Sequence, residues 1–274
     1  MGVQITSSDD PVWLRNKAYE FLVSQPVLHN MILTLLEARI ACREDGRYWV
    51  ATDGGTVAGV VLQSPLNYDA NLTPMPREVV EAMVDAISES RHALPGVNGE
   101  AATAARFAGW WTERNKCAAV PTQGLRIYEV DHVNSPAKAE GRLRQAVATD
   151  RDKVVDLMRD FYVGIGEQHG NLERIVDMRL AAGQFWLWEA GGPVSLAASS
   201  LSVAGVVRVQ AAYTPAPLRN RGYGAACVAA LSKQVRASGQ RCMLYTDLGN
   251  PISNAVFRRI GYRCVADGLR YRFV

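Results

Sequence analysis

The sequence repeats one pattern at an interval of half its length. Residues 48–59, YWVATDGGTVAG, read as an aromatic-rich strand, a Gly-Gly turn and a second strand. Residues 185–196, FWLWEAGGPVSL, follow the same plan in the second half of the 274-residue chain. Because glycine adopts the positive φ angles that tight hairpin turns require, both segments are predicted to form β-hairpins. The repeat predicts a chain built from two related halves.

A shorter repeat lies at the end of each half. Residues 124–130, GLRIYEV, resemble residues 268–274, GLRYRFV. Between the halves, residues 131–141 are polar, rich in residues that break helices and strands, and without periodicity, as expected of a linker. We therefore expect two domains, residues 1–135 and residues 141–274.

The order of elements predicted for the second half is β-α-α-β-β-β-α-β-α-β-β. Its strands are expected at Leu143–Val147, in the 185–196 hairpin, at Val206–Thr214 and Cys242–Thr246, and in a terminal hairpin across Asp267-Gly268. Its helices are expected after a cap at Thr149 or Asp150, and over Leu172–Ala182, Gly222–Ala237 and Ser253–Ile260. The first half is predicted to have two helices before Gly46, the hairpin, a helix over Arg77–Ser90, a loop at Gly96–Gly99 and a helix over Glu100–Trp111.

Composition and charge exclude several classes of protein. With 30 basic and 27 acidic side chains, the net charge of +3 creates no global field for nucleic acid or an anionic membrane. No apolar run approaches the roughly 20 residues of a membrane span, and the first residues lack the basic and apolar regions of a secretory signal. We expect a cytoplasmic protein without nucleic-acid or membrane partners, and the sequence does not indicate an oligomeric state.

The cysteines and histidines predict no metal site. The five cysteines are scattered, with no Cys-x-x-Cys pair, and the four histidines lie far apart. Cys227, Cys242 and Cys264 each sit among apolar neighbours in a predicted helix or strand, so we expect all three to be core residues.

The segment that carries chemistry is the loop Arg219-Asn220-Arg221-Gly222-Tyr223-Gly224, between a strand and a helix. The first N–H groups of a helix have no intrahelical acceptor and bind anions. Glycines at 222 and 224 let backbone approach a phosphate, and the two arginines add charge-assisted hydrogen bonds. A diphosphate is the expected ligand. A Walker loop is absent, and the dinucleotide fingerprint requires a glycine where this chain has Cys227.

This loop resembles the Gln/Arg-x-x-Gly-x-Gly/Ala signature of the GNAT superfamily of acyl-CoA-dependent N-acyltransferases. A second GNAT motif, an Asn followed by a helix, a Gly and an aromatic residue, is matched by Asn250 and by Gly261-Tyr262. The resemblance covers residues 141–274, and the first half resembles a degenerate copy. It implies an α/β fold with a mixed sheet: two GNAT-like halves, each a mostly antiparallel sheet flanked by helices, with splayed fourth and fifth strands.

The resemblance also implies that acetyl-CoA binds as a co-substrate between the strands Val206–Thr214 and Cys242–Thr246. Pantetheine would pair with the backbone of residues 212–214, and the pyrophosphate would lie on N–H groups of residues 219–225. Asn250 and Asn254 would hold the pantetheine arm or the splayed strands, or serve only as a turn and a helix cap. The implied cofactor-binding residues are Ala212, Tyr213, Thr214, Arg219, Asn220, Arg221, Gly222, Tyr223, Gly224, Ala225, Asn250 and Asn254.

The chain departs from the family where a general acid is expected. The superfamily commonly has a Tyr seven positions after the Asn, and this position is Phe257. Tyr223, Tyr245 or water are possible substitutes. A backbone N–H near Tyr213 is the implied oxyanion donor, and Glu189 and Asp247 are candidate bases or simply solvated charges at strand ends. The candidate catalytic residues are therefore Tyr213, Tyr245 and Glu189.

Three functions remain open from the sequence. The first is an N-acetyltransferase acting on a primary amine of a small molecule or peptide, and the second is a non-catalytic acyl-CoA sensor. The third is a protein-interaction module. The acceptor is expected near the loop His169-Gly170-Asn171, and the helix face of Phe107, Trp110 and Trp111 is expected to pack against the second half.

Overall fold

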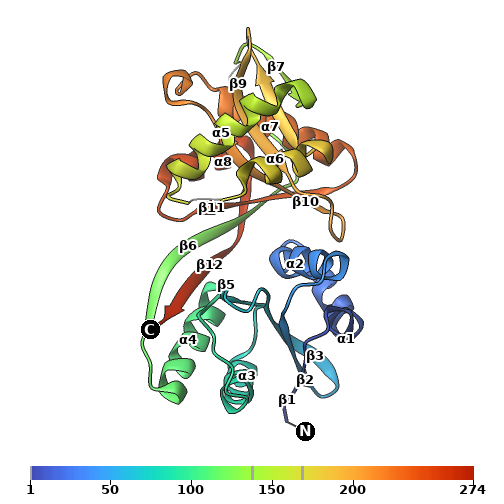
Figure 1. Cartoon of the computed structure of the whole chain (residues 1–274), viewed down its shortest axis with the longest axis vertical. Helices are drawn as coiled ribbons and strands as arrows, with labels where there is room; N and C mark the ends of the chain where they lie inside the picture. The colour runs from blue at the N-terminus through green and yellow to red at the C-terminus, as the bar shows by residue number, and fades with distance from the viewer. Residues whose placement is uncertain (1, 137–138, 168–169) are drawn as a thin grey trace. The chain divides into compact units, whose positions relative to one another are not determined.

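The computed structural model describes residues 2–136, 139–167 and 170–274 (Figure 1). Part of the expected linker, Ala137-Lys138, lies outside the described residues. The backbone divides into an N-unit, made of Met1–Ile127, Asp247–Gly249 and Cys264–Val274, and a C-unit, made of Tyr128–Thr246 and Asn250–Arg263. The division therefore differs from the expected 1–135 and 141–274, because the last residues of the chain fold with the first unit.

The N-unit follows the element order β-α-α-β-β-β-α-β-α-β. Its elements are β1 (Gln4–Ser8), α1 (Pro11–Ser24), α2 (Asn30–Ala41), β2 (Arg47–Asp53), β3 (Thr56–Gln63), β4 (Ala70–Leu72), α3 (Arg77–Glu89), β5 (Gly96–Glu100), α4 (Ala101–Asn115) and most of β6 (Ala119–Val130), joined by most of β12 (Arg263–Phe273). Its strands are ordered β1-β2-β3-β4-β5-β12-β6, and of the pairs described only β4 and β5 are parallel.

The C-unit repeats this plan. Its elements are β7 (Arg142–Gln145), η1 (Ala148–Asp150), α5 (Arg151–Gly164), α6 (Leu172–Ala181), β8 (Phe185–Glu189), β9 (Pro193–Ser199), β10 (Val206–Tyr213), η2 (Ala216–Leu218), α7 (Tyr223–Ala237), β11 (Arg241–Asp247) and α8 (Pro251–Ile260), with the end of β6 at its edge. The strand order is β6-β11-β10-β9-β8-β7, and β10 and β11 form its described parallel pair. The predicted α/β fold, with mostly antiparallel sheets flanked by helices, is confirmed.

Alternating side chains of the C-unit's strands bury both faces of its sheet. Successive side chains of a strand point to opposite faces. On β8, Phe185 and Leu187 pack with Val154 of α5, whereas Trp188 packs with Leu231 of α7. Helices α5 and α6 therefore cover one face, and α7 and α8 cover the other (Figure 1).

The aromatic face of α4 belongs to the core of the N-unit. Phe107 is fully buried there with Trp49 and Val97, and the ring of Trp111 stacks on Phe273 at 5.3 Å between centroids. The expectation that this face packs against the second half therefore holds for Trp111, which meets the last strand of that half, whereas Phe107 packs on residues of the first half. The local pattern revealed that the face is buried, but not what covers it.

The expected terminal hairpin is a single strand. Residues 268–272 of β12 pair antiparallel with β5, from Gly268 opposite Glu100 to Arg272 opposite Gly96. A Cβ at Gly268 would lie 3.1 Å from the carbonyl oxygen of Gly99, so this glycine permits close packing of two strands and makes no turn. Asp267 receives two hydrogen bonds from Arg126, at 2.6 and 2.8 Å.

The Gly96–Gly99 segment, expected to be a loop, is a strand. It is not the N-unit's counterpart of the loop Arg219–Gly224. A Cβ at Gly96 would lie 2.2 Å from the carbonyl oxygen of Tyr271, so its glycine serves strand packing. By element order, β4 and α3 occupy the places of β10 and α7, and the segment that joins them is residues 73–76, TPMP. This segment has neither glycine nor arginine, and proline lacks the N–H that an anion would bind.

We predict that Arg270→Ala destabilises the N-unit. Arg270 of β12 forms an ion pair with the buried carboxylate of Asp69. Removing the arginine leaves that carboxylate without its cation, and because Arg270 itself is 39% exposed the expected cost is about 1–2 kcal/mol. Hydrogen exchange of the β5 amides measures the effect. The matched control, Arg272→Ala, removes an exposed arginine of the same strand and should leave exchange unchanged; equal effects of the two substitutions would contradict the assignment.

Candidate functional site

The C-unit's sheet opens between β10 and β11. The two strands pair only from Val206 opposite Arg241 to Val209 opposite Leu244. No described pairing joins them beyond these residues, so the last residues of each strand lack this partner. The predicted splaying of the fourth and fifth strands is confirmed.

A β-bulge turns the backbone of β10 where the opening begins. The register against β9 shifts between Gln210 and Tyr213, and Ala211 adopts a φ of 50°. Positive φ is uncommon outside glycine, and bulges often re-aim a strand beside a functional site. The hydroxyl of Ser195 donates to the carbonyl of Tyr213 at 2.9 Å and lies 2.9 Å from the hydroxyl of Thr214. The bulge and the contacts of Ser195 together fix the backbone conformation of residues 211–214.

The loop after β10 leads into an uncapped helix. Asn220 and Gly222 adopt positive φ angles of 63° and 81°, and Gly222 stands at the N-cap of α7. No side chain caps this helix, and its first intrahelical hydrogen bond runs from Ala226 N to Gly222 O at 2.9 Å. The N–H groups of residues 223–225 precede that bond and therefore lie where a helix N-terminus binds anions.

Glycine is needed at positions 222 and 224 of the loop for different structural reasons. At Gly222 an added Cβ would meet only Ala139, at 3.7 Å, so the positive φ requires glycine and the space beside it is open. At Gly224 an added Cβ would lie 3.0 Å from the hydroxyl oxygen of Thr214, so glycine lets the first turn of α7 pack on the end of β10.

The two arginines of the loop also differ. The Nε of Arg219 donates to the carbonyl of Thr214 at 3.0 Å, and its guanidinium lies 5.8 Å from the centroid of the Tyr213 ring. Arg219 therefore holds the loop against the strand end. Arg221 is exposed, and its charge faces solvent beside the helix N-terminus. Together they give the loop a local positive charge.

The second sequence motif builds the start of α8. The side-chain oxygen of Asn250 accepts a hydrogen bond from Ser253 N at 3.0 Å. Asn254 is buried; its oxygen accepts from the hydroxyl of Tyr128 at 3.1 Å, and its amide nitrogen donates to the carbonyl of Asn250 at 2.8 Å. Asn250 thus fixes the start of α8, and Asn254 also joins this helix to β6. Their contact with a cofactor stays a prediction.

Phe257 offers no proton, and its tyrosine neighbour does not replace it. Its ring packs edge to face on Tyr262, at 6.0 Å between centroids. The hydroxyl of Tyr262 lies 2.7 Å from Ser232 Oγ and 3.3 Å from Cys242 Sγ, and burial raises the pKa of Tyr262 well above its ordinary value. This phenol is a structural part of the core.

Comparisons with known proteins agree with this geometry. Residues 190–271 match the model of a family described as FR47-like protein. The structure is similar to an acetyltransferase of the GNAT family from Colwellia psychrerythraea, with 10% identity over 99% of this chain and 100% of that one and a TM-score of 0.62. It is similar to a GCN5-related N-acetyltransferase from Sphaerobacter thermophilus, with 15% identity over 98% and 95% of the chains and a TM-score of 0.63. The chain has the GNAT fold.

A tandem protein shares this fold along its whole length. The tandem GNAT protein from the clavulanic acid biosynthesis pathway aligns over 98% of this chain and 97% of its own, with 10% identity and a TM-score of 0.55. A search of curated proteins found no match. The FR47-like match spans both sequence motifs, residues 219–224 and 250–262, and the GNAT resemblance inferred from them is confirmed.

Of the candidate catalytic residues, Tyr213 and Tyr245 border the opening of the GNAT fold. Tyr213 packs against the cluster beneath α5 and α6. On β11, Leu244 packs on the α7 side, so Tyr245 points to the same face as Tyr213. The Arg208 guanidinium lies 5.4 Å from the centroid of the Tyr245 ring. The structure thus places two phenols on the strands that separate.

Of the candidate bases, Glu189 lies away from the opening, on β8, whereas Asp247 ends β11. Glu189 accepts a hydrogen bond from Arg144 Nε at 2.9 Å, on a strand that β9 separates from β10. Arg144 also binds Asp150 at 2.6 and 2.8 Å, and this contact lowers the pKa of Asp150. One oxygen of Asp247 accepts from Gly249 N at 2.7 Å. The proposed acceptor-loop residue His169 lies outside the described residues.

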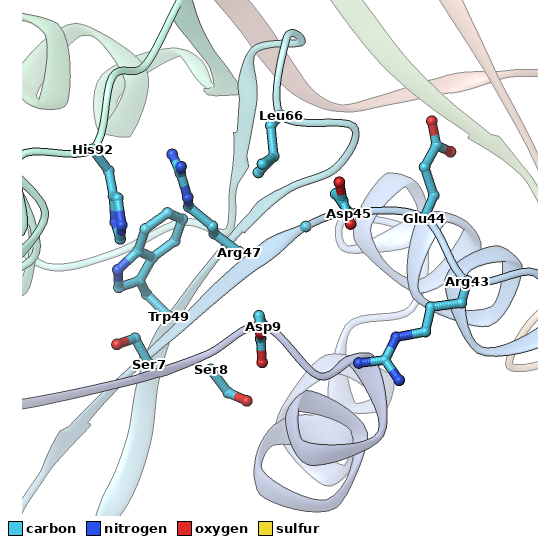
Figure 2. A pocket seen from close by; sticks show the side chains of 11 residues that line it. Ser7, Ser8, Asp9, Arg43, Glu44, Asp45, Arg47, Trp49, Leu66 and His92 are labelled. Carbon is cyan, nitrogen blue, oxygen red and sulfur yellow. The ribbon is translucent and has the colours of Figure 1, made fainter.

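A separate pocket of about 450 Å³ lies in the N-unit (Figure 2). Side chains of β1, β2 and the segment after α2 line it together with His92, whose ring nitrogen Nδ1 is 2.9 Å from Ser90 Oγ. Burial, and secondarily the charge of Arg47, lowers the pKa of His92. None of the residues predicted to bind a cofactor lines this pocket.

Neither a metal cluster nor a membrane-spanning helix emerges from the described ranges. Within them, no group of three or more His, Cys, Asp or Glu side chains is arranged to hold a metal ion. Among the helices that they contain, none combines the length and the apolar character needed to cross a membrane.

Cysteine reactivity should follow burial. Burial raises the pKa of Cys227 to about 12 and also raises the pKa of Cys242, whereas Cys42 is exposed. Cys264 is exposed as well, so its expected core position is wrong: the strand that carries it turns this side chain outward. Because the thiolate is the reactive form, a maleimide at pH 8 should label Cys42 rapidly and leave Cys227 and Cys242 unlabelled until denaturant is added. Peptide mass spectrometry measures both; native labelling of Cys227 as fast as that of Cys42 would contradict this reading.

Proposed function

We propose that the C-unit transfers an acetyl group from acetyl-CoA to a primary amine of a small molecule or peptide. The observation that carries the proposal is the uncapped N-terminus of α7, preceded by the Arg219–Gly224 loop, at the open end of the β10 and β11 pair. This combination offers backbone donors for a diphosphate next to the end of β10, which extends beyond its pairing with β11. The fold shared with GNAT acetyltransferases supports it.

In this proposal acetyl-CoA binds along the C-terminal end of β10. The N–H groups of residues 223–225, with Arg221, hold the diphosphate. Pantetheine pairs with the backbone of residues 212–214 as an added strand does at a sheet edge. The thioester then lies between the separating strands, near Tyr213 and Tyr245.

The reaction requires little acid catalysis from the protein. The neutral amine attacks the thioester carbon, the N–C bond forms, the C–S bond breaks, and CoA leaves as a thiolate while the amine proton passes to a base or to solvent. A backbone N–H near Tyr213 stabilises the oxyanion. A thiol pKa near 8.5 allows the leaving group to depart without full protonation, so Phe257 is compatible with turnover. The phenol of Tyr245 is the candidate proton donor.

The N-unit has a different role in this proposal. Its counterpart segment, residues 73–76, offers no glycine or arginine for a diphosphate. We infer that the halves 1–135 and 141–274 arose by duplication, and that the first half serves structure or shapes the acceptor site.

A second candidate function is a non-catalytic acyl-CoA sensor. It is favoured by Phe257 at the usual position of the acid and by the ion pair that engages Glu189. This alternative shares the cofactor site with the transferase and differs from it only in turnover.

We predict that Gly222→Glu weakens acetyl-CoA binding, measured by calorimetry. The new side chain strains a positive φ and places a carboxylate where the diphosphate binds, so affinity should fall at least about tenfold. Gly239→Glu is the matched control, because Gly239 has a φ of 79° and open space around it. It should carry a similar cost in stability and retain full affinity.

Turnover distinguishes the two candidate functions. Release of CoA thiol across a panel of amines supports the transferase. Binding without release of thiol or transfer of labelled acetyl groups supports the sensor. If the unsubstituted protein does not bind acetyl-CoA, both functions are wrong.

A further inference from the structure

Arg179 of α6 is a half-buried residue whose guanidinium has an orphaned donor. Its Nη2 atom is buried, and no described residue accepts a hydrogen bond from it. Its Nε makes only a long bond, 3.4 Å, to the side-chain oxygen of Gln184. A buried donor without an acceptor costs free energy, because it has lost its water without gaining a partner. The site therefore holds a positive group that the described residues leave incompletely satisfied.

The surroundings of Arg179 contain no compensating carboxylate in the described part of the chain. The guanidinium lies 5.0 Å from the centroid of the Phe185 ring, and none of the described ion pairs includes it. Burial lowers the pKa of Arg179; Tyr162 opposes this effect, and the charge of Arg208 adds to it. Arginines elsewhere in the unit, such as Arg144 and Arg241, bind carboxylates directly.

Arg208 places a second guanidinium on the same face of the sheet. On β10, Val207 and Val209 pack on the α7 side, so Arg208 between them points to the face covered by α5 and α6. Phe185, which underlies Arg179, belongs to this same face. Arg208 precedes by one residue the last pair of β10 and β11, and it lies over Tyr245.

The two faces of the separating strands present different groups to a thioester between them. The α7 side of the strands is filled by the core cluster of Cys227, Leu231 and Leu244, and in the proposed function the helix N-terminus on that side holds the diphosphate. Tyr213 packs on the other face, beneath α5 and α6, and Tyr245 lies there beside Arg208. In the proposed function we therefore expect the amine to approach from the face where Arg179 and Arg208 lie. A guanidinium fork pairs in bidentate fashion with carboxylate or phosphate oxygens.

We propose that the acceptor carries an anionic group, a carboxylate or a phosphate ester, beside its amine, and that Arg179 together with Arg208 binds this group. The inference rests on the proposed function for the identity of the reaction, but the anion site itself is defined by the two guanidinium groups. It assigns a substrate class: small amino acids or aminoalkyl phosphates rather than polyamines or aminoglycosides, which carry no anionic group.

Matched amines test the substrate class with the full-length protein and acetyl-CoA. L-Amino acids are compared with their methyl esters, and O-phosphoethanolamine with ethanolamine, by the rate of CoA thiol release. The anionic member of at least one pair should have a kcat/KM at least about tenfold higher, and the pair that shows it distinguishes carboxylate from phosphate. Equal rates within both pairs would overturn the inference while leaving the proposed function intact.

Substitutions test whether Arg179 binds the anionic group of the acceptor. Arg179→Gln should raise the KM for anionic amines at least about tenfold, with little change for the neutral members and none in acetyl-CoA affinity. Arg179→Lys should recover part of the loss, since it keeps the charge without the fork. Arg174→Gln, an exposed arginine of the same helix, is the control and should change nothing. Equal losses for anionic and neutral amines in Arg179→Gln would contradict the inference.

Two measurements remain informative without turnover. Calorimetric binding of the same anionic amines to the CoA-bound protein, lost in Arg179→Gln, would support the anion site even if the transferase function fails; absence of such binding and of anion-selective turnover would overturn it. The melting temperature separates a structural role. Removing an unsatisfied buried charge should leave Tm unchanged or raise it, whereas a purely structural arginine would lower Tm on substitution.

Discussion

The separation of β10 and β11 after Val209 and Leu244 is the feature on which the rest of the C-unit's site depends. Parallel strands end at the same edge of a sheet, and their connection must cross over through a helix, here α7. The carboxyl end of β10 therefore runs into the loop that starts α7, while that of β11 runs towards α8. Because pairing stops before both ends, each strand keeps backbone groups for a ligand, and the Ala211 bulge sets the direction of one of them.

The N-unit has the same plan without the loop chemistry on which the proposed cofactor site depends. There the parallel pair is β4 and β5, and β5 is also paired with β12, whose backbone closes on Gly96. The segment before α3 is TPMP, so the helix start lacks both the flexible backbone and the positive charge found before α7. The chemistry belongs to the loop residues, and the fold supplies their position.

The sequence predicted features with local causes. The positive φ of Gly222 has a local cause. The two Gly-Gly hairpins, the helices and the order of elements in the second half before its last strand followed from turn residues and periodicity. What depends on distant partners was missed. Asp267-Gly268 has the composition of a turn but lies within a strand, because Gly268 must pass close to Gly99. Likewise, the sequence pattern predicts that Phe107 is buried but not which residues cover it. Arg179 belongs to no motif, and only its buried donor and its position beside Arg208 distinguish it.

The most direct test of the account is hydrogen exchange with and without acetyl-CoA, read at the amides of residues 211–214 and 220–225. The account predicts that the ligand protects both segments, since pantetheine pairs with the first and the diphosphate accepts hydrogen bonds from the second. The amides of Thr73 and Met75, in the corresponding segment of the N-unit, should exchange at the same rate in both states. Protection confined to the N-unit, or none at residues 220–225 at saturating ligand, would contradict the central claim.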